Sequence, residues 1–291
     1  MKYIDIHCHL DSKDFDSDRD EVFVRMKEKE IRAVTIGADL ESSKRAVEIA
    51  EANENVWACI GVHPEIITSP RSASQSDPLL EAGEGKNSSL PLHLGEGQLA
   101  EGKWDEVKFE KLVKSPKVVG IGECGLDYFR LSGDVEEEKN KQKALFIQQI
   151  QFAIKHDKPL MLHCREAYGD VLKILKNYKR QVAEKLRGNV HFFAGNIEVA
   201  QKFLDLDFTM SFTGVITFTN DYDEVIMYVP NNSIMAETDA PWVAPAPFRG
   251  KRNEPVYVIE VIKKIAEIRG EDFDILNNTI IENFRRVFLA F

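Results

Sequence analysis

The chain has 291 residues, of which 43% are hydrophobic and 30% are charged, and its formal net charge at pH 7 is −10. This length is sufficient for one large α/β domain whose core needs no disulfide bonds. The acidic balance argues against a surface that coats duplex DNA by neutralising many phosphates, although a small, locally basic catalytic mouth is compatible with it.

The cysteines and the N-terminal residues indicate an intracellular protein. Residues 1 to 10 contain Asp5, His7 and His9, which a secretory signal does not tolerate, and no other stretch approaches membrane-spanning length. We therefore expect a soluble, cytoplasmic protein that has no membrane association and needs no obligate protein partner. Reduced, buried thiols are expected at all four cysteines, which stand in apolar runs: Cys8, Cys59, Cys124 and Cys164.

Eight short β-rich runs follow one another along the chain. They are Tyr3–Leu10, Ala33–Ala38, Val56–Val62, Val118–Cys124, Pro159–Cys164, Asn189–Ala194, Phe208–Thr213 and Ser233–Glu237. Amphipathic stretches with helical spacing alternate with them, including Glu41–Ala52, Glu136–His156 and Ala167–Lys179. This alternation predicts parallel strands joined by crossover helices, and a single-domain (β/α)8 TIM-type barrel over residues 1–291 is the simplest α/β fold that satisfies it.

Two segments depart from this alternation. Val256–Arg269 and Phe273–Phe288 predict two helices separated by Gly270, and we expect both to close the outer helical layer. Residues 69–103, after the third strand, are rich in Gly, Ser and Pro, as in an inserted loop. Since this loop leaves from the C-terminal face of a barrel, it is either a tolerated surface insertion or a flap beside the catalytic mouth.

The first strand carries two histidines on one face. Tyr3, Asp5, His7 and His9 alternate with apolar residues, so their side chains point to the same side. The Cα atoms of His7 and His9 are expected roughly 6 to 7 Å apart, a separation that lets both imidazoles reach one metal ion. A lone His-x-His pair is weak evidence, because paired histidines also occur as ordinary polar residues.

Four further strands end in residue types that bind metals. Glu123 ends the fourth run, His163 stands near the end of the fifth, His191 lies in the sixth and Asp239 follows the eighth. Barrel active sites lie at the C-terminal ends of the strands, whereas the interior is otherwise filled by apolar side chains. Together with His7 and His9, these residues predict a metal site.

Several runs resemble the motifs of the TatD-type metal-dependent deoxyribonucleases of the amidohydrolase superfamily. They are Ile4-Asp-Ile-His-Cys-His-Leu-Asp11, Gly61-Val-His-Pro64, Gly122-Glu-Cys-Gly-Leu-Asp-Tyr128, Leu162-His-Cys-Arg165, Glu237-Thr-Asp-Ala-Pro241 and Arg249-Gly-Lys-Arg-Asn-Glu-Pro255. The resemblance covers nearly the whole chain apart from the inserted loop. One departure is His191-Phe-Phe-Ala-Gly195, where the family usually has His-Cys-Phe-Ser-Gly, but the ligand histidine is kept.

The resemblance implies two divalent metal ions per chain. Glu123 would bridge the ions, and Asp239 would also act as the base that takes a proton from a water held between them as the attacking hydroxide. Ligand softness favours zinc, manganese or iron over magnesium, whereas the family commonly uses magnesium or manganese. The remaining ligands implied are His7 and His9, with Asp239, on one ion and His163 and His191 on the other.

Residues that contact the substrate are less sharply defined by the sequence. Arg165 and the cluster Arg249–Arg252, which includes Lys251, are candidates for phosphate contacts, but charged runs are also typical of a solvated surface. His63 either touches a substrate phosphate or supports the site from behind. Tyr128 either stacks on a base or packs beside its strand.

We therefore expect a deoxyribonuclease that works as a 3'-5' exonuclease on single-stranded DNA ends. One alternative is an amide or lactone hydrolase of the amidohydrolase superfamily, because the same activated water attacks a carbonyl. Glu123 argues against this alternative, since binuclear members often carry a modified lysine on the fourth strand. A non-catalytic metal-binding protein is a second alternative, but loss of a ligand would be expected there, and all six are present.

Overall fold

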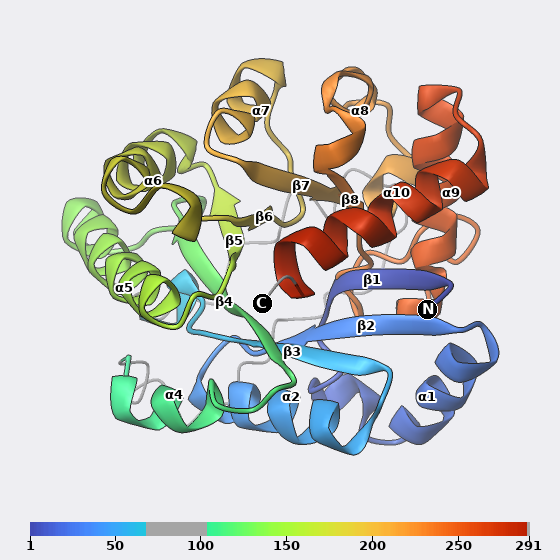
Figure 1. Cartoon of the computed structure of the whole chain (residues 1–291), viewed down its shortest axis with the longest axis horizontal. Coiled ribbons are helices and arrows are strands. Elements are labelled where there is room, and N and C mark those ends of the chain that lie inside the picture. Colours follow the sequence, from blue (N-terminus) through green and yellow to red (C-terminus); the bar gives the residue numbers. More distant parts are fainter. Residues whose placement is uncertain (68–103, 290–291) are drawn as a thin grey trace.

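The computed structural model describes residues 1–67 and 104–289, and its centre is a barrel of eight parallel strands paired in chain order (Figure 1). The barrel closes between the last strand and the first through a bridge from Cys8 to Ala240 and a 2.7 Å hydrogen bond from the His9 amide to the Ala240 carbonyl. The predicted (β/α)8 fold is confirmed. The strands are β1 (Tyr3–Cys8), β2 (Ile31–Ile36), β3 (Val56–Ile60), β4 (Val118–Asp127), β5 (Leu160–Arg165), β6 (Gly188–Val190), β7 (Phe208–Phe212) and β8 (Ile234–Ala236).

Helices form a ring around the strands (Figure 1). Side-chain caps fix where several of them begin: Asp39 and Asn196, for example, each accept a hydrogen bond from a backbone amide of the first turn that follows. The helices are α1 (Arg19–Glu28), α2 (Leu40–Ala52), α4 (Glu106–Leu112), α5 (Val135–Lys155), α6 (Tyr168–Val182), α7 (Ile197–Leu204), α8 (Asp223–Tyr228), α9 (Val258–Arg269) and α10 (Phe273–Phe284). Short 3-10 segments include Lys13–Phe15, Pro64–Ile67, Ala183–Lys185, Gly214–Thr217, Asn231–Ser233 and Pro255–Tyr257.

Helix α10 and the π-helical turn Arg285–Leu289 cover the N-terminal end of the barrel (Figure 1). Helix α10 packs on β1 and β8, and the turn packs on β4 and β6. The side chains of Phe284 and Phe288 are fully buried there. We expected both C-terminal helices in the outer layer, and for α10 this prediction was wrong, because its apolar residues close the open end of the barrel.

Strands β4 and β5 approach each other very closely at Gly125. Its φ is 143°, and a Cβ atom placed on it would overlap the carbonyl oxygen of His163, so a side chain does not fit there. Gly125 pairs with His163 in the parallel ladder. This pairing places Glu123, two residues earlier on β4, beside the histidine of β5.

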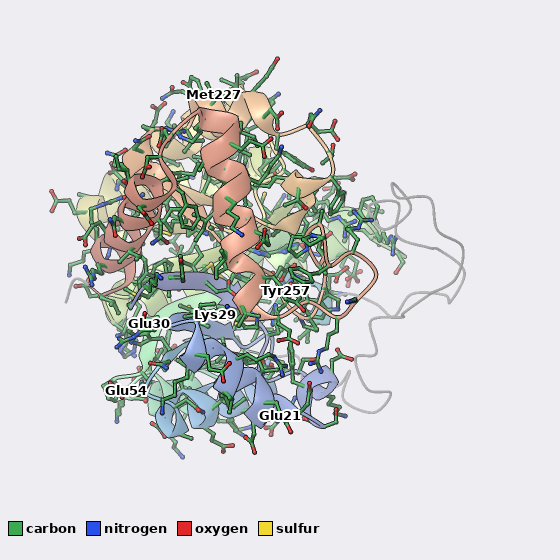
Figure 2. The ribbon with its side chains drawn as sticks, turned by 90° about the vertical axis from the view of Figure 1, so that its right-hand side faces the viewer. Glu21, Lys29, Glu30, Glu54, Met227 and Tyr257 are labelled. Carbon is green, nitrogen blue, oxygen red and sulfur yellow. The ribbon has the colours of Figure 1, made fainter. Side chains whose placement is uncertain are left out.

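The loops that lead into the strands lie at the end of the barrel opposite to the ligand residues. Glu54, Glu30 and Lys29 come from the loops before β3 and β2, and in Figure 2 they lie to the left of Tyr257, the residue before α9. The predicted ligands lie at the other ends of the strands. All of the predicted insertion, residues 69–103, falls outside the described residues.

Two further sequence-based expectations bear on the fold. All four cysteines are free and buried, as predicted. Within the parts of the chain that the structure describes, none of the helices combines the length and the apolar character needed to cross a membrane.

Candidate metal centre

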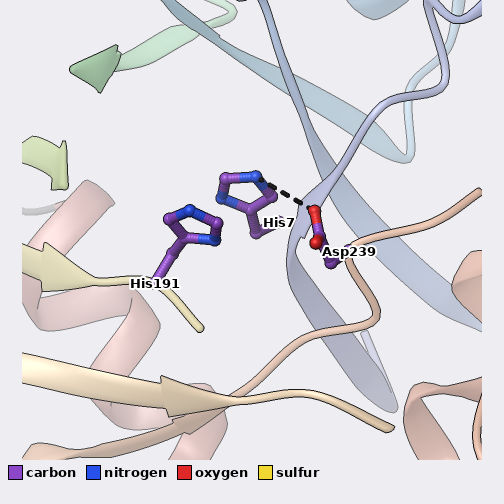
Figure 3. A group of neighbouring side chains, drawn as sticks. All are labelled: His7, His191 and Asp239. Carbon is purple, nitrogen blue, oxygen red and sulfur yellow. Dashed lines mark ion pairs between the residues drawn. The ribbon is translucent and has the colours of Figure 1, made fainter. Parts of the chain in front are cut away.

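Three predicted ligands meet where β1 and β8 close the barrel. The amide of Asp239 donates to the carbonyl of His7 at 2.9 Å, so that Asp239 is fixed beside the end of β1. Its φ of 55° is uncommon for a residue other than glycine, and such strained positions cluster at functional sites. Asp239 Oδ1 lies 3.6 Å from Nε2 of His7 and 3.6 Å from Nε2 of His9 (Figure 3 shows the contact with His7).

Glu123 completes this first set of ligand atoms with one of its carboxylate oxygens. Its Oε2 lies 3.6 Å from His7 Nε2 and 3.7 Å from His9 Nε2, and the two Nε2 atoms are 3.2 Å apart. Bonds of about 2 Å to a tetrahedral ion place neighbouring ligand atoms about 3.3 Å apart. The first set thus contains the Nε2 atoms of His7 and His9, Asp239 Oδ1 and Glu123 Oε2. The distances between these four atoms suit a divalent ion at their centre.

The other carboxylate oxygen of Glu123 faces a second set of ligand atoms. Oε1 lies 2.8 Å from Nε2 of His191 and 2.9 Å from Nδ1 of His163, and these two nitrogens are 3.3 Å apart. Burial raises the pKa of Glu123, but the positive charge of His191 and hydrogen bonds from His163 and His191 outweigh burial, so this pKa lies well below its usual range. Glu123 is a carboxylate whose two oxygens serve different sets.

Two of the histidines have their outer ring nitrogens held by protein acceptors. Nδ1 of His9 donates to the carbonyl oxygen of Ile36 at 2.9 Å, and Nε2 of His163 donates to Oδ2 of Asp127 at 2.8 Å. Because a neutral imidazole carries one N–H, these bonds leave His9 Nε2 and His163 Nδ1 as lone-pair donors toward the cluster. Metal binding requires this tautomer in both rings.

Without a metal, the same carboxylates hold protons on these two rings. Burial lowers the pKa of His9, but Asp239 and Glu123 outweigh burial and raise this pKa to about 9. The pKa of His163 is likewise raised to about 9 by Asp127 and Glu123 against the effect of burial. Cations at the centre would take the place of these protons.

Glu237 supports the second set from beneath. It is fully buried, and its Oε1 lies 3.5 Å from Nδ1 of His191 and accepts a 2.6 Å hydrogen bond from the Phe192 amide. Its Oε2 accepts a 2.6 Å hydrogen bond from the hydroxyl of Ser211. These bonds hold the chain just after β6, where Phe192 has a φ of 44°, and so fix the direction of His191.

The ring of His7 lies against that of His191, with the two centroids 3.9 Å apart and the planes nearly parallel (Figure 3). Nδ1 of His7 is buried and has no hydrogen-bond partner within residues 1–67 and 104–289. Burial and the neighbouring imidazoles lower the pKa of His7 well below its ordinary value. His7 is therefore a neutral imidazole, the form that binds metals.

His63 joins the cluster in a different role. Its Nδ1 accepts a 3.2 Å hydrogen bond from the Glu65 amide, so its Nε2 carries the ring hydrogen. That Nε2 lies 3.4 Å from Oε1 of Glu123. A donor aimed at an anionic position suits a hydrogen bond to an oxygen atom better than coordination of a metal.

The assembled residues fit divalent metal ions. Imidazole nitrogens and carboxylate oxygens are suitable ligands for such ions, and the first and second sets bring them together in a buried site at the barrel mouth. Three overlapping groups have ligand atoms within 4.8 Å of one another: His7, His191 and Asp239; His7, His9 and Glu123; and His63, Glu123 and His163.

A family model described as TatD related DNase matches residues 4–289. The chain belongs to this family. It is 36% identical over 287 residues to "Uncharacterized metal-dependent hydrolase YabD" of Bacillus subtilis, covering 98% of each chain. It is 30% identical over 293 residues to "3'-5' ssDNA/RNA exonuclease TatD" of Pectobacterium parmentieri, again covering 98% of each. The crystal structure of YJJV, a TatD homologue from Escherichia coli, superposes with a TM-score of 0.77 at 25% identity, covering 99% of this chain and 98% of that one.

This member of the TatD family is thus a metal-dependent hydrolase, and the six residues predicted as metal ligands lie together at the barrel mouth. The predicted substrate-binding residues lie outside the two sets of ligand atoms. Arg165 stacks over the ring of Phe129 at 3.6 Å, and Arg249 stacks over the ring of Phe218 at 3.4 Å. Lys251 is exposed.

Two of the residues considered for substrate contacts instead connect parts of the scaffold. The hydroxyl of Tyr128 donates to Asp170 of α6 at 2.9 Å, which favours the packing interpretation of this tyrosine. Arg252 donates to both carboxylate oxygens of Asp18 at 2.6 and 2.7 Å. Its guanidinium ties the loop after β8 to the start of α1, which favours a structural role for Arg252 over a phosphate contact.

Sequence reasoning missed three residues that position the site. Asp127 and Glu237 orient His163 and His191, and Asp5 accepts hydrogen bonds from the amide and hydroxyl of Thr238 at 2.9 and 2.5 Å. The signal for Asp127 was present, since Glu123, Gly125 and Asp127 alternate along one strand and share a face. For Asp5 and Glu237, the same two-residue spacing from a ligand was available.

Proposed function

We propose that this TatD-family hydrolase is a deoxyribonuclease that uses two divalent metal ions and removes nucleotides one at a time from single-stranded 3' ends. The observation that carries the proposal is the division of the ligand atoms by Glu123, whose Oε2 faces His7 and His9 and whose Oε1 faces His163 and His191. Two ions roughly 3.5 to 4 Å apart repel each other, and a shared carboxylate screens that repulsion.

Bound divalent ions would supply a water whose pKa is lowered to near neutrality and positive charge beside the phosphoryl oxygens. The protein residues around them have separate tasks. Asp239, whose side chain is 13% exposed, lies where solvent reaches the first set, and its carboxylate accepts the proton of the attacking water. His63 donates from its Nε2 to a phosphoryl oxygen, which is the role that its hydrogen bond from Glu65 prepares.

The proposal that the substrate is a phosphodiester rests on the positive charges near the site and on the names of the relatives. Arg165, the last residue of β5, lies over the ring of Phe129 after β4, and Arg249, in the loop after β8, lies over the ring of Phe218 after β7. Both are at the face where the ligands lie. Guanidinium groups in such positions suit an anionic, unpaired strand. The relative from Pectobacterium parmentieri carries the name of a 3'-5' exonuclease for single-stranded DNA and RNA, which supports the proposed polarity.

The test is a nuclease assay with 5'-labelled single-stranded DNA in the presence of manganese or magnesium. We expect stepwise shortening from the 3' end, slower digestion of blunt duplex, no cleavage of closed circles and complete inhibition by a chelator. Glu123→Gln should abolish the activity, and Glu198→Gln, at an exposed ion pair on α7, is the matched control that should retain it.

The same metal-loaded protein is assayed with RNA, amide and lactone substrates. Hydrolysis of an amide or a lactone without any nuclease activity would overturn the proposal. Cleavage of closed circles at a rate comparable with that of linear strands would overturn the exonuclease assignment.

A further inference from the structure

Trp242 is a large exposed aromatic residue fixed beside the metal centre. It follows Asp239 by three residues, and its ring lies 4.8 Å from that of His9 between centroids, at 65°. Its amide donates to the Asp239 carbonyl at 3.0 Å, and its own carbonyl accepts a 2.6 Å hydrogen bond from Asn253, whose side chain is buried. Trp242 is nevertheless 37% exposed, so a large aromatic residue is held in contact with solvent next to a ligand.

Two loop segments extend from this tryptophan as one continuous rim, which we define as residues 214–218 after β7 and 242–249 after β8. Gly214 lies so close to the Val243 carbonyl that an added Cβ would approach it to 2.5 Å. Further along, the Ala246 amide donates to the Thr217 hydroxyl at 2.8 Å. The contacts occur in the same order along both segments, so the rim runs from Trp242 toward its other end.

The far end of the rim is the stack of Arg249 on Phe218. The guanidinium carbon of Arg249 lies 3.4 Å from the centroid of the Phe218 ring, yet that phenylalanine remains 40% exposed and Arg249 is exposed as well. The stack therefore does not serve to bury Phe218. It presents a planar cation and an aromatic ring together on a protein whose net charge is −10.

These features match the chemistry of an unpaired nucleic-acid strand. Bases stack on aromatic side chains whatever their identity, and a guanidinium stacks on a base while attracting the neighbouring phosphate. A base in a duplex is already stacked and paired, so it cannot use such a platform without first leaving its partner. A rim of this kind discriminates between single strands and duplexes without reading sequence.

We propose that the rim is a base-stacking platform, on which Trp242 holds the base next to the bond that is cut and the Phe218–Arg249 pair holds a neighbouring nucleotide. The inference rests on the proposed nuclease function and names the residues that make it specific for unpaired ends. Trp242 takes the position nearest the bond because it is the rim residue that contacts His9.

The test combines rim variants with substrates that lack bases. Wild type, Trp242→Ala and Trp242→Phe are compared on a single-stranded oligonucleotide and on the same oligonucleotide with abasic residues at its last two positions. Loss of one base–aromatic stack lowers kcat/KM roughly 5- to 150-fold. We expect Trp242→Ala to show this loss on the normal strand and less than about a twofold change on the abasic strand, with Trp242→Phe close to wild type.

A control variant, a second rim variant and the abasic substrate complete the experiment. Met227→Ala, at an exposed residue of α8 outside the rim, should leave both substrates unaffected. Phe218→Ala should also lose activity selectively on the strand that carries bases. The abasic substrate reports directly whether each variant keeps a folded, metal-loaded centre.

The outcomes separate the two proposals. Equal losses on both substrates, or no loss on either, would overturn the platform while leaving the nuclease function in place. A wild-type protein that cleaves neither substrate would overturn the nuclease function and the platform with it.

Discussion

Asp127 accepts a 2.8 Å hydrogen bond from Nε2 of His163, and this bond turns Nδ1 of the same ring toward Glu123. Asp127 is itself held in place, because its amide and carbonyl both bond to the side chain of Gln142 at 2.8 and 2.7 Å. Carboxylates that orient ligand histidines are integral to metal sites, although they do not touch the ion.

Replacing Asp127 by Asn should therefore weaken metal binding about 10- to 100-fold, since an amide no longer favours the required tautomer of His163. The measurement is a calorimetric titration with zinc or manganese. Asp157→Asn, at an exposed ion pair with Arg187, is the control and should bind as wild type does. Unchanged affinity in Asp127→Asn would show that the hydrogen bond does not prepare the ligand.

Asp239→Asn should separate chemistry from folding. Asparagine tolerates a positive φ, so the backbone at this position should be preserved and the melting temperature nearly unchanged. Loss of the base should lower turnover roughly 10²- to 10⁴-fold, and by more where metal is also lost. A variant with near-wild-type turnover under saturating metal would exclude Asp239 as the base.

Metal binding should release protons at neutral pH. The pKa values of His9 and His163 are raised from 6.5 to about 9 in the metal-free protein, so both rings carry an extra proton below that pH. These protonated rings stabilise the metal-free fold fully below about pH 6.5 and lose that contribution as the pH rises through 9. Metal must displace the protons, so its affinity should rise from pH 7 to pH 9.

The expected increase in affinity is up to about tenfold per pH unit for each proton displaced. Calorimetry in buffers of different ionisation enthalpy counts the released protons directly. The result expected near pH 7.5 is about three per fully loaded chain, because Glu123 and Glu237 also raise the pKa of His191 well above its ordinary value. A metal affinity that stays constant between pH 7 and pH 9 would contradict this account.

Arg252 and Arg249 should behave differently when each is replaced by Ala. Arg252 pairs with Asp18 and lies 4.5 Å over the ring of Phe15, so its loss should reduce the free energy of unfolding by about 1 kcal/mol and leave DNA binding unchanged. Loss of Arg249 should instead lower the slope of log affinity against log salt by about 0.7 for single-stranded DNA. Equal effects of both variants on that slope would refute the division of roles.

The barrel and its ligand set could be predicted because both follow from the local periodicity of the sequence. His7 and His9 share a strand face, and each further ligand stands at or just past a strand end, so the topology of a parallel barrel brings them together. Helix α10 could not be placed in the same way. An amphipathic pattern indicates that one face of a helix is buried. It does not indicate whether that face packs on the outside of the barrel or across its end.

The supporting residues were harder to predict for a related reason. Asp5, Asp127 and Glu237 stand at an even spacing from a ligand, but they act through hydrogen bonds to segments up to 233 residues away in sequence, as from Asp5 to Thr238. The spacing does not identify those distant partners. The role of Arg252 depended likewise on the position of Asp18. The role of Trp242 could not be predicted, because the sequence alone does not distinguish an aromatic side chain packed in the core from one exposed to solvent.

The central claim is that Glu123 divides the ligands between two metal ions. Anomalous X-ray diffraction from crystals grown with manganese tests it most directly, because it locates each ion independently of activity. The account predicts two peaks roughly 3.5 to 4 Å apart, one beside each carboxylate oxygen of Glu123, with both weakened in Glu123→Gln. A single peak in the wild-type protein, or two peaks on the same side of Glu123, would contradict it.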